Sequence, residues 1–283
     1  MPSGVTGEVV EQHILEQGAR LRADGAVTGW ASLRWHGAHY FDGAAASRGA
    51  RLPVPLVIPG GFLRPDPGTL VLRGQLAPSE WSVIAGLRCT TVQRALFDEI
   101  ARRGSLRASV VAVDMTVAAG LISLDLFATY LAGCRSRNGV VLAREASRLA
   151  VVGSWSPQET WMRLCWILDA GLPPPRCNVP VFDHHGRHLG TPDLFDEEAG
   201  VVGEYQGAIH RDHRRHRHDV QRAERFREHG LEYFEVVAGE MADATTVPDR
   251  MRRVRARAKF LPPESRAWTL EPPPWWSSGH LSG

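Results

Sequence analysis

The sequence HLGTPDLFDEEAGVVGEYQ, which occupies residues 188 to 206, predicts two neighbouring β-strands joined by a tight turn. Apolar residues are frequent in both parts, at residues 188 to 195 and 200 to 206, and the acidic residues between them are typical of a turn. A hairpin centred on that turn places Asp193 and Glu204 directly across from each other. The expected register therefore brings two carboxylates together within an otherwise apolar pair of strands.

The predicted pairing of Asp193 with Glu204 requires a source of positive charge. Opposed residues have Cβ atoms about 4.5 to 5.5 Å apart, and like charges in that position destabilise a sheet. A divalent cation is the simplest compensation, and Mg²⁺ or Mn²⁺ suits oxygen ligands. Strand periodicity places Gln206 on the same face as Glu204, although a polar edge position would also explain this glutamine. A metal ion held at this point activates water and stabilises charge on a phosphate, as phosphodiester hydrolysis requires.

The segments around this hairpin predict a domain of the α/β (α+β) class. A capping box of Ser156 and Glu159, with Pro157 at the first helical position, begins a helix that ends at Gly171. The other elements expected are a strand at residues 178–182, a long polar helix at 212–229 and a strand at 231–237. The resulting order is helix, three strands, helix, strand.

This half of the chain resembles the PD-(D/E)XK nuclease superfamily. Pro192-Asp193 matches the opening of that motif, and Glu204-Tyr205-Gln206 matches its second half. Within the superfamily, the chain is most similar to bacterial domains related to very-short-patch-repair endonucleases, which carry an E-x-x-G-x-x-H run followed by D-x-x-R and a glycine. The matching positions in this sequence are residues 204–210 (EYQGAIH), Asp219, Arg222 and Gly230.

The resemblance implies a restriction-endonuclease-like αβββαβ core and a Mg²⁺- or Mn²⁺-dependent DNA endonuclease acting in DNA repair or phage defence. It implies that Asp193 and Glu204 bind the metal ion. Glu159, His210 and Gln206 would complete the catalytic group, although Glu159 also has a structural role in the capping box. Gln206 stands where the superfamily has lysine, and the only lysine of the chain lies outside the core. Because glutamine brings no positive charge, the alternative is a catalytically weak or inactive DNA-binding regulator of antitoxin type.

Arginines that follow the hairpin are predicted to contact nucleic acid. Arg211, Arg214 and Arg222 lie in or beside the long polar helix, where a basic face can bind phosphate. A solvated helix face explains them equally well, and Arg222 can simply pair with Asp219 three residues earlier. DNA is the expected substrate, and an RNA-directed nuclease remains a third hypothesis.

Residues 1 to 155 predict a mixed, mainly helical domain. A helix capped by Thr90 or Thr91 runs to Arg103 and is followed by Gly104. Strands are expected at residues 56–60 and 69–73, and further helices at 109–119, 123–132 and 139–149.

The first half also resembles the AbiEi family of abortive-infection antitoxins. The residues that carry the likeness are 27–32 (VTGWAS), 35–37 (WHG) and 90–98 (TTVQRALFD). The resemblance implies DNA binding or a role in phage defence, with a toxin or another defence-system component as a partner. His36 within the second of these runs is interpreted as a packed or capping residue rather than a ligand.

The composition is that of a globular protein with room for two domains. The chain has 283 residues, of which 43% are hydrophobic and 23% are charged. No run approaches the length of about 18 to 20 apolar residues that spans a bilayer, so no membrane association is expected. The four cysteines are far apart and form no CxxC pair, which favours a cytoplasmic protein. The expected domains are residues 1–155, 156–241 and 242–283, the last a basic segment with a disordered, proline-rich tail.

Overall fold

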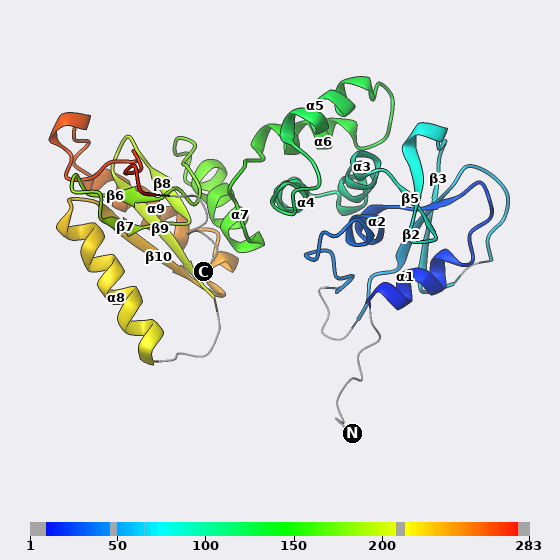
Figure 1. Ribbon diagram of the computed structural model, residues 1–283, viewed down its shortest axis with the longest axis horizontal. Coiled ribbons are helices and arrows are strands. Elements are labelled where there is room, and N and C mark those ends of the chain that lie inside the picture. Colours follow the sequence, from blue (N-terminus) through cyan, green and yellow to red (C-terminus); the bar gives the residue numbers. More distant parts are fainter. Residues whose placement is uncertain (1–9, 46–49, 65, 208–212, 277–283) are drawn as a thin grey trace. The chain divides into compact units, whose positions relative to one another are not determined.

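The computed structural model describes residues 10–45, 50–64, 66–207 and 213–276, with the backbone alone for residues 213–220 and 242. The chain divides into two compact units, Met1–Val152 and Gly153–Gly283 (Figure 1). Both units combine helices with strands, so the chain belongs to the mixed α/β (α+β) class. Among the described residues, no helix combines the length and the apolar character that crossing a membrane requires.

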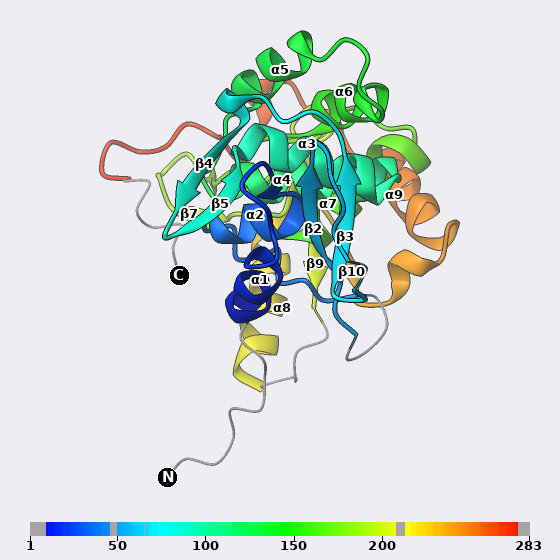
Figure 2. The same cartoon turned by 90° about the vertical axis from the view of Figure 1, so that its right-hand side faces the viewer.

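A five-stranded mixed sheet forms the centre of the first unit and consists of β1 (Ala26–Val27), β2 (Val54–Ile58), β3 (Thr69–Arg73), β4 (Trp81–Ile84) and β5 (Leu87–Thr90). Its strand order is β3-β2-β1-β5-β4. Strands β2 and β3 run parallel, side by side (Figure 2), whereas β4 and β5 form an antiparallel pair. Every residue of β2 is buried, as expected for a strand in the interior of a sheet.

The helices of the first unit are α1 (Val10–Gly18), α2 (Gly29–Trp35), α3 (Val92–Arg103), α4 (Leu106–Ala118), α5 (Leu124–Gly133) and α6 (Val140–Leu149). The helix predicted to follow the two threonines is confirmed as α3. Thr91 occupies its N-cap position, and Gly104 follows it in the left-handed conformation with φ of 63°. The two predicted strands correspond to β2 and β3, the first with an offset of two residues.

The second unit begins with α7 (Pro157–Leu164), which continues into a π-helical turn (Cys165–Asp169). The elements that follow are β6 (Val181–Phe182), β7 (His188–Gly190), β8 (Leu194–Asp196), β9 (Val201–Gln206), α8 (His213–Glu228), β10 (Glu232–Val237) and α9 (Thr246–Arg257). The predicted N-cap of α7 is confirmed, because the Ser156 hydroxyl accepts a hydrogen bond from the Glu159 backbone N–H at 3.2 Å. Strands β6 and β7 pair with each other, and a three-stranded sheet has the order β10-β9-β8.

The single strand predicted at residues 188 to 195 is two strands in the structure. β7 pairs with β6, whereas β8 pairs with β9, so the chain changes sheet between Gly190 and Leu194. Proline supplies no N–H to a strand ladder, which explains why regular pairing stops at Pro192. Asp193 therefore lies directly before the first paired residue of β8.

Helices cover both faces of the three-stranded sheet. On one face, Val201 packs with Trp166 of the π-helical turn and with Met251 of α9. On the other face, Val202 packs with Phe226 of α8, the helix that lies along the sheet in Figure 1. Because successive residues of a strand point to opposite faces, the even-numbered residues of β9 face α8.

Residues 242 to 276 differ from the expectation of a separate basic segment with a disordered tail. The apolar residues Val247, Met251 and Val254 of α9 lie in the core of the second unit. Trp268 is buried in the core on the opposite face of the sheet. The physical reason is that apolar residues recur among the arginines at helical spacing, which gives α9 a face to bury.

Gly203 of β9 is predicted to be essential for the packing of this sheet. A Cβ atom at this position would lie 2.3 Å from Cζ of Phe234 and 2.5 Å from its Cε1, so the Phe234 ring must move. Phe234 is stacked on Trp166 with ring centroids 5.8 Å apart, which leaves little freedom for that movement. We expect Gly203→Ala to lower the free energy of unfolding of the second unit by about 1 to 3 kcal/mol, measured by denaturant titration.

Gly207 provides the matched control for this substitution. It lies just beyond the end of β9, and a Cβ atom there would meet no heavy atom of the described residues within 4 Å. Gly207→Ala is expected to leave the unfolding midpoint unchanged. Equal midpoints for Gly203→Ala and the wild type would contradict the packing argument.

Candidate functional site

The two carboxylates that the sequence pairs lie at one end of the β8–β9 ladder. Leu194 pairs with Gly203, and the next step of this register places Asp193 opposite Glu204. The Oδ2 atom of Asp193 accepts a hydrogen bond from the Tyr205 backbone N–H at 2.7 Å, which holds its side chain against β9. The predicted register of the hairpin is therefore confirmed.

A row of acidic residues crosses three neighbouring strands on the face that α8 covers. Glu204 and Gln206 share the strand parity of Val202, whose side chain packs on that face. Glu235 of β10 is in register with Glu204, so it adds a third carboxylate beside the pair formed with Asp193. Like charges on adjacent strands destabilise a sheet unless a counter-charge lies nearby.

Arg222 of α8 supplies positive charge to this row. Its Nη2 atom donates a hydrogen bond to Oε2 of Glu204, and the two side chains form an ion pair. The side chain of Glu204 is only 4% exposed, whereas that of Arg222 is 32% exposed. The sequence predicts a metal ion as the compensating charge for the carboxylates; in the structure an arginine contributes to that compensation.

Asp193 is an electrostatically perturbed carboxyl group. Burial raises its pKa to about 6, and the negative charge of Glu159 adds to the rise. The hydrogen bond from Tyr205 and the positive charge of Arg222 oppose the shift without cancelling it. The charge of ionised Asp193 is therefore incompletely compensated, which is a property that carboxyl groups of functional sites often have.

Glu159 lies near the acidic pair, but structural contacts occupy its carboxylate. Its Oε2 atom accepts hydrogen bonds from Trp155 N at 2.8 Å and from Nδ2 of Asn178 at 2.7 Å. The backbone N–H of Asn178 also donates to the Pro192 carbonyl at 3.1 Å, so Asn178 links Glu159 to the residue before Asp193. Sequence reasoning missed Asn178. The only clue in the sequence is an asparagine beside apolar residues. In the structure, Asn178 has a φ of 51°, which asparagine tolerates better than most residues.

Several residues predicted for the site fall outside what the structure describes. His210 and Arg211 are not among the described residues. Arg214 and Asp219 lie in α8, where the structure describes their backbone but not their side chains. Their predicted roles in catalysis and nucleic-acid binding stay predictions.

The donor chemistry of the acidic pair suits a divalent cation. Asp193 and Glu204 offer hard carboxylate oxygens from neighbouring strands, which Mg²⁺ and Mn²⁺ prefer. Burial raises the pKa of Asp193, and a cation beside the carboxyl group would oppose that rise. Two features oppose this fit: Arg222 already contacts Glu204, and the described residues contain no group of three or more His, Cys, Asp or Glu side chains that could hold a metal ion.

Several arginines of α9 make contacts within the second unit. Arg250 forms an ion pair with Glu240 at 2.7 Å, and Arg255 forms one with Asp196 at 2.8 Å. Arg252 donates to the carbonyl of Ala170 at 3.2 Å, just after the π-helical turn. These contacts show that Arg250, Arg252 and Arg255 stabilise the fold of the second unit.

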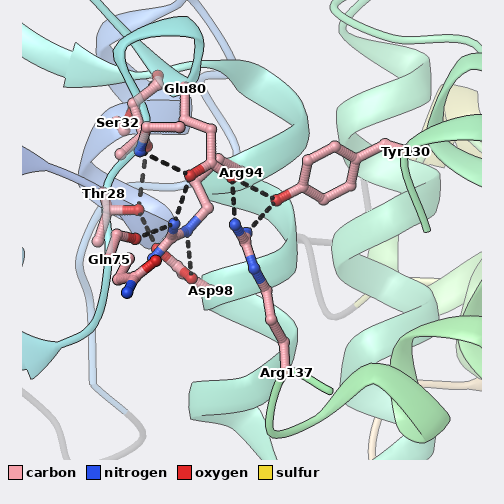
Figure 3. A network of polar contacts seen from close by, with 10 residues as sticks. Thr28, Ser32, Gln75, Glu80, Arg94, Asp98, Tyr130 and Arg137 are labelled. Atoms are coloured by element: carbon pink, nitrogen blue, oxygen red, sulfur yellow. Dashed lines mark hydrogen bonds and ion pairs between the residues drawn. The ribbon is translucent and has the colours of Figure 1, made fainter. Parts of the chain in front are cut away.

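A second polar cluster lies inside the first unit, and Figure 3 shows it from close by. Arg94 of α3 donates from Nη1 to Oε2 of Glu80 at 3.0 Å and from Nε to Oδ1 of Asp98 at 2.9 Å. The Thr28 hydroxyl donates to the other oxygen of Asp98 at 2.6 Å. Arg137 forms an ion pair with Oε1 of Glu80 at 2.7 Å. Each carboxylate of this cluster thus accepts from more than one donor, which is typical of a structural network.

This buried cluster joins residues 27–32, His36 and residues 90–98, which lie far apart in the sequence. Thr28 and Ser32 come from residues 27–32, and the Ser32 hydroxyl donates to the carbonyl of Thr90 at 2.9 Å. A ring nitrogen of His36 lies 2.9 Å from the same carbonyl, in agreement with a packed role for this histidine. The runs therefore have a structural explanation in the attachment of α2 and α3 to the sheet.

Comparisons of the chain with protein-family models, with curated proteins and with solved structures found no match. The functional assignment therefore depends on the geometry and the electrostatics of the side chains themselves.

Proposed function

We propose that the second unit is a metal-dependent DNA endonuclease that hydrolyses phosphodiester bonds, in DNA repair or phage defence. The observation that carries this proposal is the pair formed by Asp193 and Glu204, two carboxylates on adjoining strands of which the first has a raised pKa. The same proposal includes a restriction-endonuclease-like core for the second unit. It also includes the resemblance of this unit to the very-short-patch-repair relatives of the PD-(D/E)XK superfamily.

Each residue near the pair has a defined role in the proposed enzyme. Asp193 and Glu204 would hold Mg²⁺ or Mn²⁺. When bound, such an ion lowers the pKa of a water molecule and stabilises negative charge on the phosphate. Gln206, on the same face, orients water, while Glu159 adds negative charge near Asp193. His210 is proposed as a proton donor, since an imidazole titrates near neutral pH. The arginines proposed to bind DNA phosphates are Arg211, Arg214 and Arg222.

A second candidate function is a DNA-binding regulator of antitoxin type that retains the fold without catalysis, together with a toxin or other defence-system partner. Two specific observations favour it. Gln206 replaces the lysine of the motif, and Arg222 holds one of the two carboxylates that a metal ion would need. Such a regulator would bind DNA in a salt-dependent manner without a metal ion.

Incubation of the purified full chain with supercoiled plasmid DNA tests the choice between these functions. We expect nicking or linearisation with Mg²⁺ or Mn²⁺, none with EDTA, and none for Asp193→Ala. Glu228→Ala, which removes an exposed carboxylate from α8, is the matched control and should cleave like the wild type. Absence of cleavage by the wild type, or undiminished cleavage by Asp193→Ala, would refute the endonuclease. DNA binding that survives Asp193→Ala and EDTA would then support the regulator, and an RNA substrate in parallel identifies the preferred nucleic acid.

A further inference from the structure

We propose that Arg222 and the divalent cation compete for the carboxylate of Glu204. When a nucleic-acid phosphate binds Arg222, the ion pair with Glu204 breaks and Glu204 can bind the cation. This inference rests on the proposed endonuclease function and deepens it. In it, Arg222 is a positioning residue that couples occupation of the metal site to the presence of substrate.

The competition follows from the position of Glu204. Its side chain is 4% exposed, and the Nη2 atom of Arg222 contacts its Oε2 atom. A cation bound to this carboxylate would lie beside the guanidinium, and two positive charges repel strongly where little water screens them. Arg222 therefore already contacts one of the two proposed metal ligands.

The release of Arg222 follows from its own surroundings. The Cδ atom of its stem lies 3.3 Å from where a Cβ of Gly190 would be, so the stem is packed beside β7. Its side chain is nevertheless 32% exposed, so the residue lies at the surface, where a ligand can reach it. A guanidinium binds the oxygens of a phosphate through paired hydrogen bonds, with geometry that matches a carboxylate equally well. A phosphate can therefore take over the contact now made by Glu204.

Coupling of this kind is reciprocal. If substrate phosphate removes Arg222 from Glu204, DNA raises the affinity for the cation, and the cation raises the affinity for DNA by the same factor. The site would thus bind its metal ion weakly until a phosphodiester is present. Such an arrangement restricts the assembly of the hydrolytic site to the nucleic-acid complex.

Mn²⁺ binding by the full chain, measured by electron paramagnetic resonance, tests the coupling without reference to cleavage. We expect Arg222→Gln to bind Mn²⁺ about tenfold more tightly than the wild type in the absence of DNA. A phosphorothioate DNA duplex, with its own Mn²⁺ binding subtracted, should tighten binding by the wild type to a similar extent and leave Arg222→Gln unchanged. Arg222→Lys, which retains the charge, should bind Mn²⁺ more weakly than Arg222→Gln and provides a second variant if the glutamine destabilises the fold.

Arg227→Gln is the matched control, because it removes the same charge from α8 at an exposed position over the ring of Tyr233. It should bind Mn²⁺ like the wild type with and without the duplex. Equal Mn²⁺ affinities of the wild type and Arg222→Gln would overturn the coupling and leave the proposed function intact. Absence of Mn²⁺ binding by every form, including the complex with the duplex, would overturn the coupling and the metal-dependent function together.

Discussion

Asp193→Asn is expected to abolish DNA cleavage and, at neutral pH without divalent cations, to make the second unit more stable than the wild type. The loss of cleavage follows from the loss of a negatively charged ligand opposite Glu204. The gain in stability follows from the raised pKa of Asp193, because the folded protein disfavours the ionised carboxylate. Under the proposed function, Asp193 would be an active residue that destabilises its own fold, which is a common compromise in enzymes.

The pH dependence of this gain has a defined sign. Below the ordinary pKa of 3.8, Asp193 is protonated in both the folded and the unfolded chain and contributes no difference. Between 3.8 and about 6 the unfolded chain loses the proton first, so the wild type loses stability as the pH rises. Above pH 6 the loss is complete and amounts to about 1 to 3 kcal/mol, since one pKa unit corresponds to about 1.4 kcal/mol.

Hydrogen exchange of peptides from β8 and β9 in the presence of EDTA measures this effect within the second unit. We expect slower exchange in Asp193→Asn than in the wild type at pH 7, and equal exchange, after correction for the intrinsic rate, near pH 4. Asp183→Asn is a control of opposite sign. Burial raises the pKa of Asp183, but hydrogen bonds from the Arg187 and His185 backbone outweigh burial and lower it overall, so this variant should destabilise the fold at pH 7. If the wild type were as stable as Asp193→Asn at pH 7, the negative charge of Asp193 would be compensated in solution, which would contradict the prediction.

Arg94→Ala is expected to destabilise the first unit by about 3 to 5 kcal/mol, which is a large fraction of the stability of an ordinary domain, about 5 to 15 kcal/mol. Arg94 is buried and forms ion pairs with both Glu80 and Asp98. Its removal leaves two buried carboxylates without their shared guanidinium, and an uncompensated buried charge is far more costly than an exposed one. Burial already raises the pKa of Asp98 despite the opposing charge of Arg94.

Circular dichroism and denaturant unfolding of the full chain measure the effect of Arg94→Ala. Arg148→Ala removes an exposed arginine from α6 of the same unit and should change the unfolding free energy by less than about 0.5 kcal/mol. Adding Glu80→Gln and Asp98→Asn to Arg94→Ala should recover part of the lost stability, because the uncompensated negative charges of the two carboxylates are then absent. A first unit that unfolds at the wild-type midpoint after Arg94→Ala would contradict the proposed importance of the network.

Local patterns in the sequence were sufficient for the elements that bear the candidate site. Strand parity and the acidic turn predicted the register that places Asp193 opposite Glu204, because cross-strand pairing in a short hairpin depends on its turn. Helix ends were equally accessible. Ser156 caps α7 and Gly104 ends α3, since capping depends on residues within one helical turn of the helix end.

The interactions of the site with other elements were decided by tertiary structure. Arg222 and Glu204 are 18 residues apart, and nothing in the periodicity of α8 indicates which of its arginines contacts the sheet. The same holds for Asn178, which joins Glu159 of α7 to Pro192 across 19 and 14 residues of sequence. Long-range polar contacts depend on how the elements pack, and that packing leaves no local signal.

The acidic pair opposite the turn is thus a property of the sequence, because it follows from strand periodicity and hairpin register. Its electrostatic state is a property of the fold. Burial raises the pKa of Asp193, and the packing of α8 on the sheet brings Arg222 onto Glu204; both effects depend on tertiary contacts. The sequence accordingly predicts where a cation would bind, whereas the tertiary structure introduces the arginine that we propose competes with it.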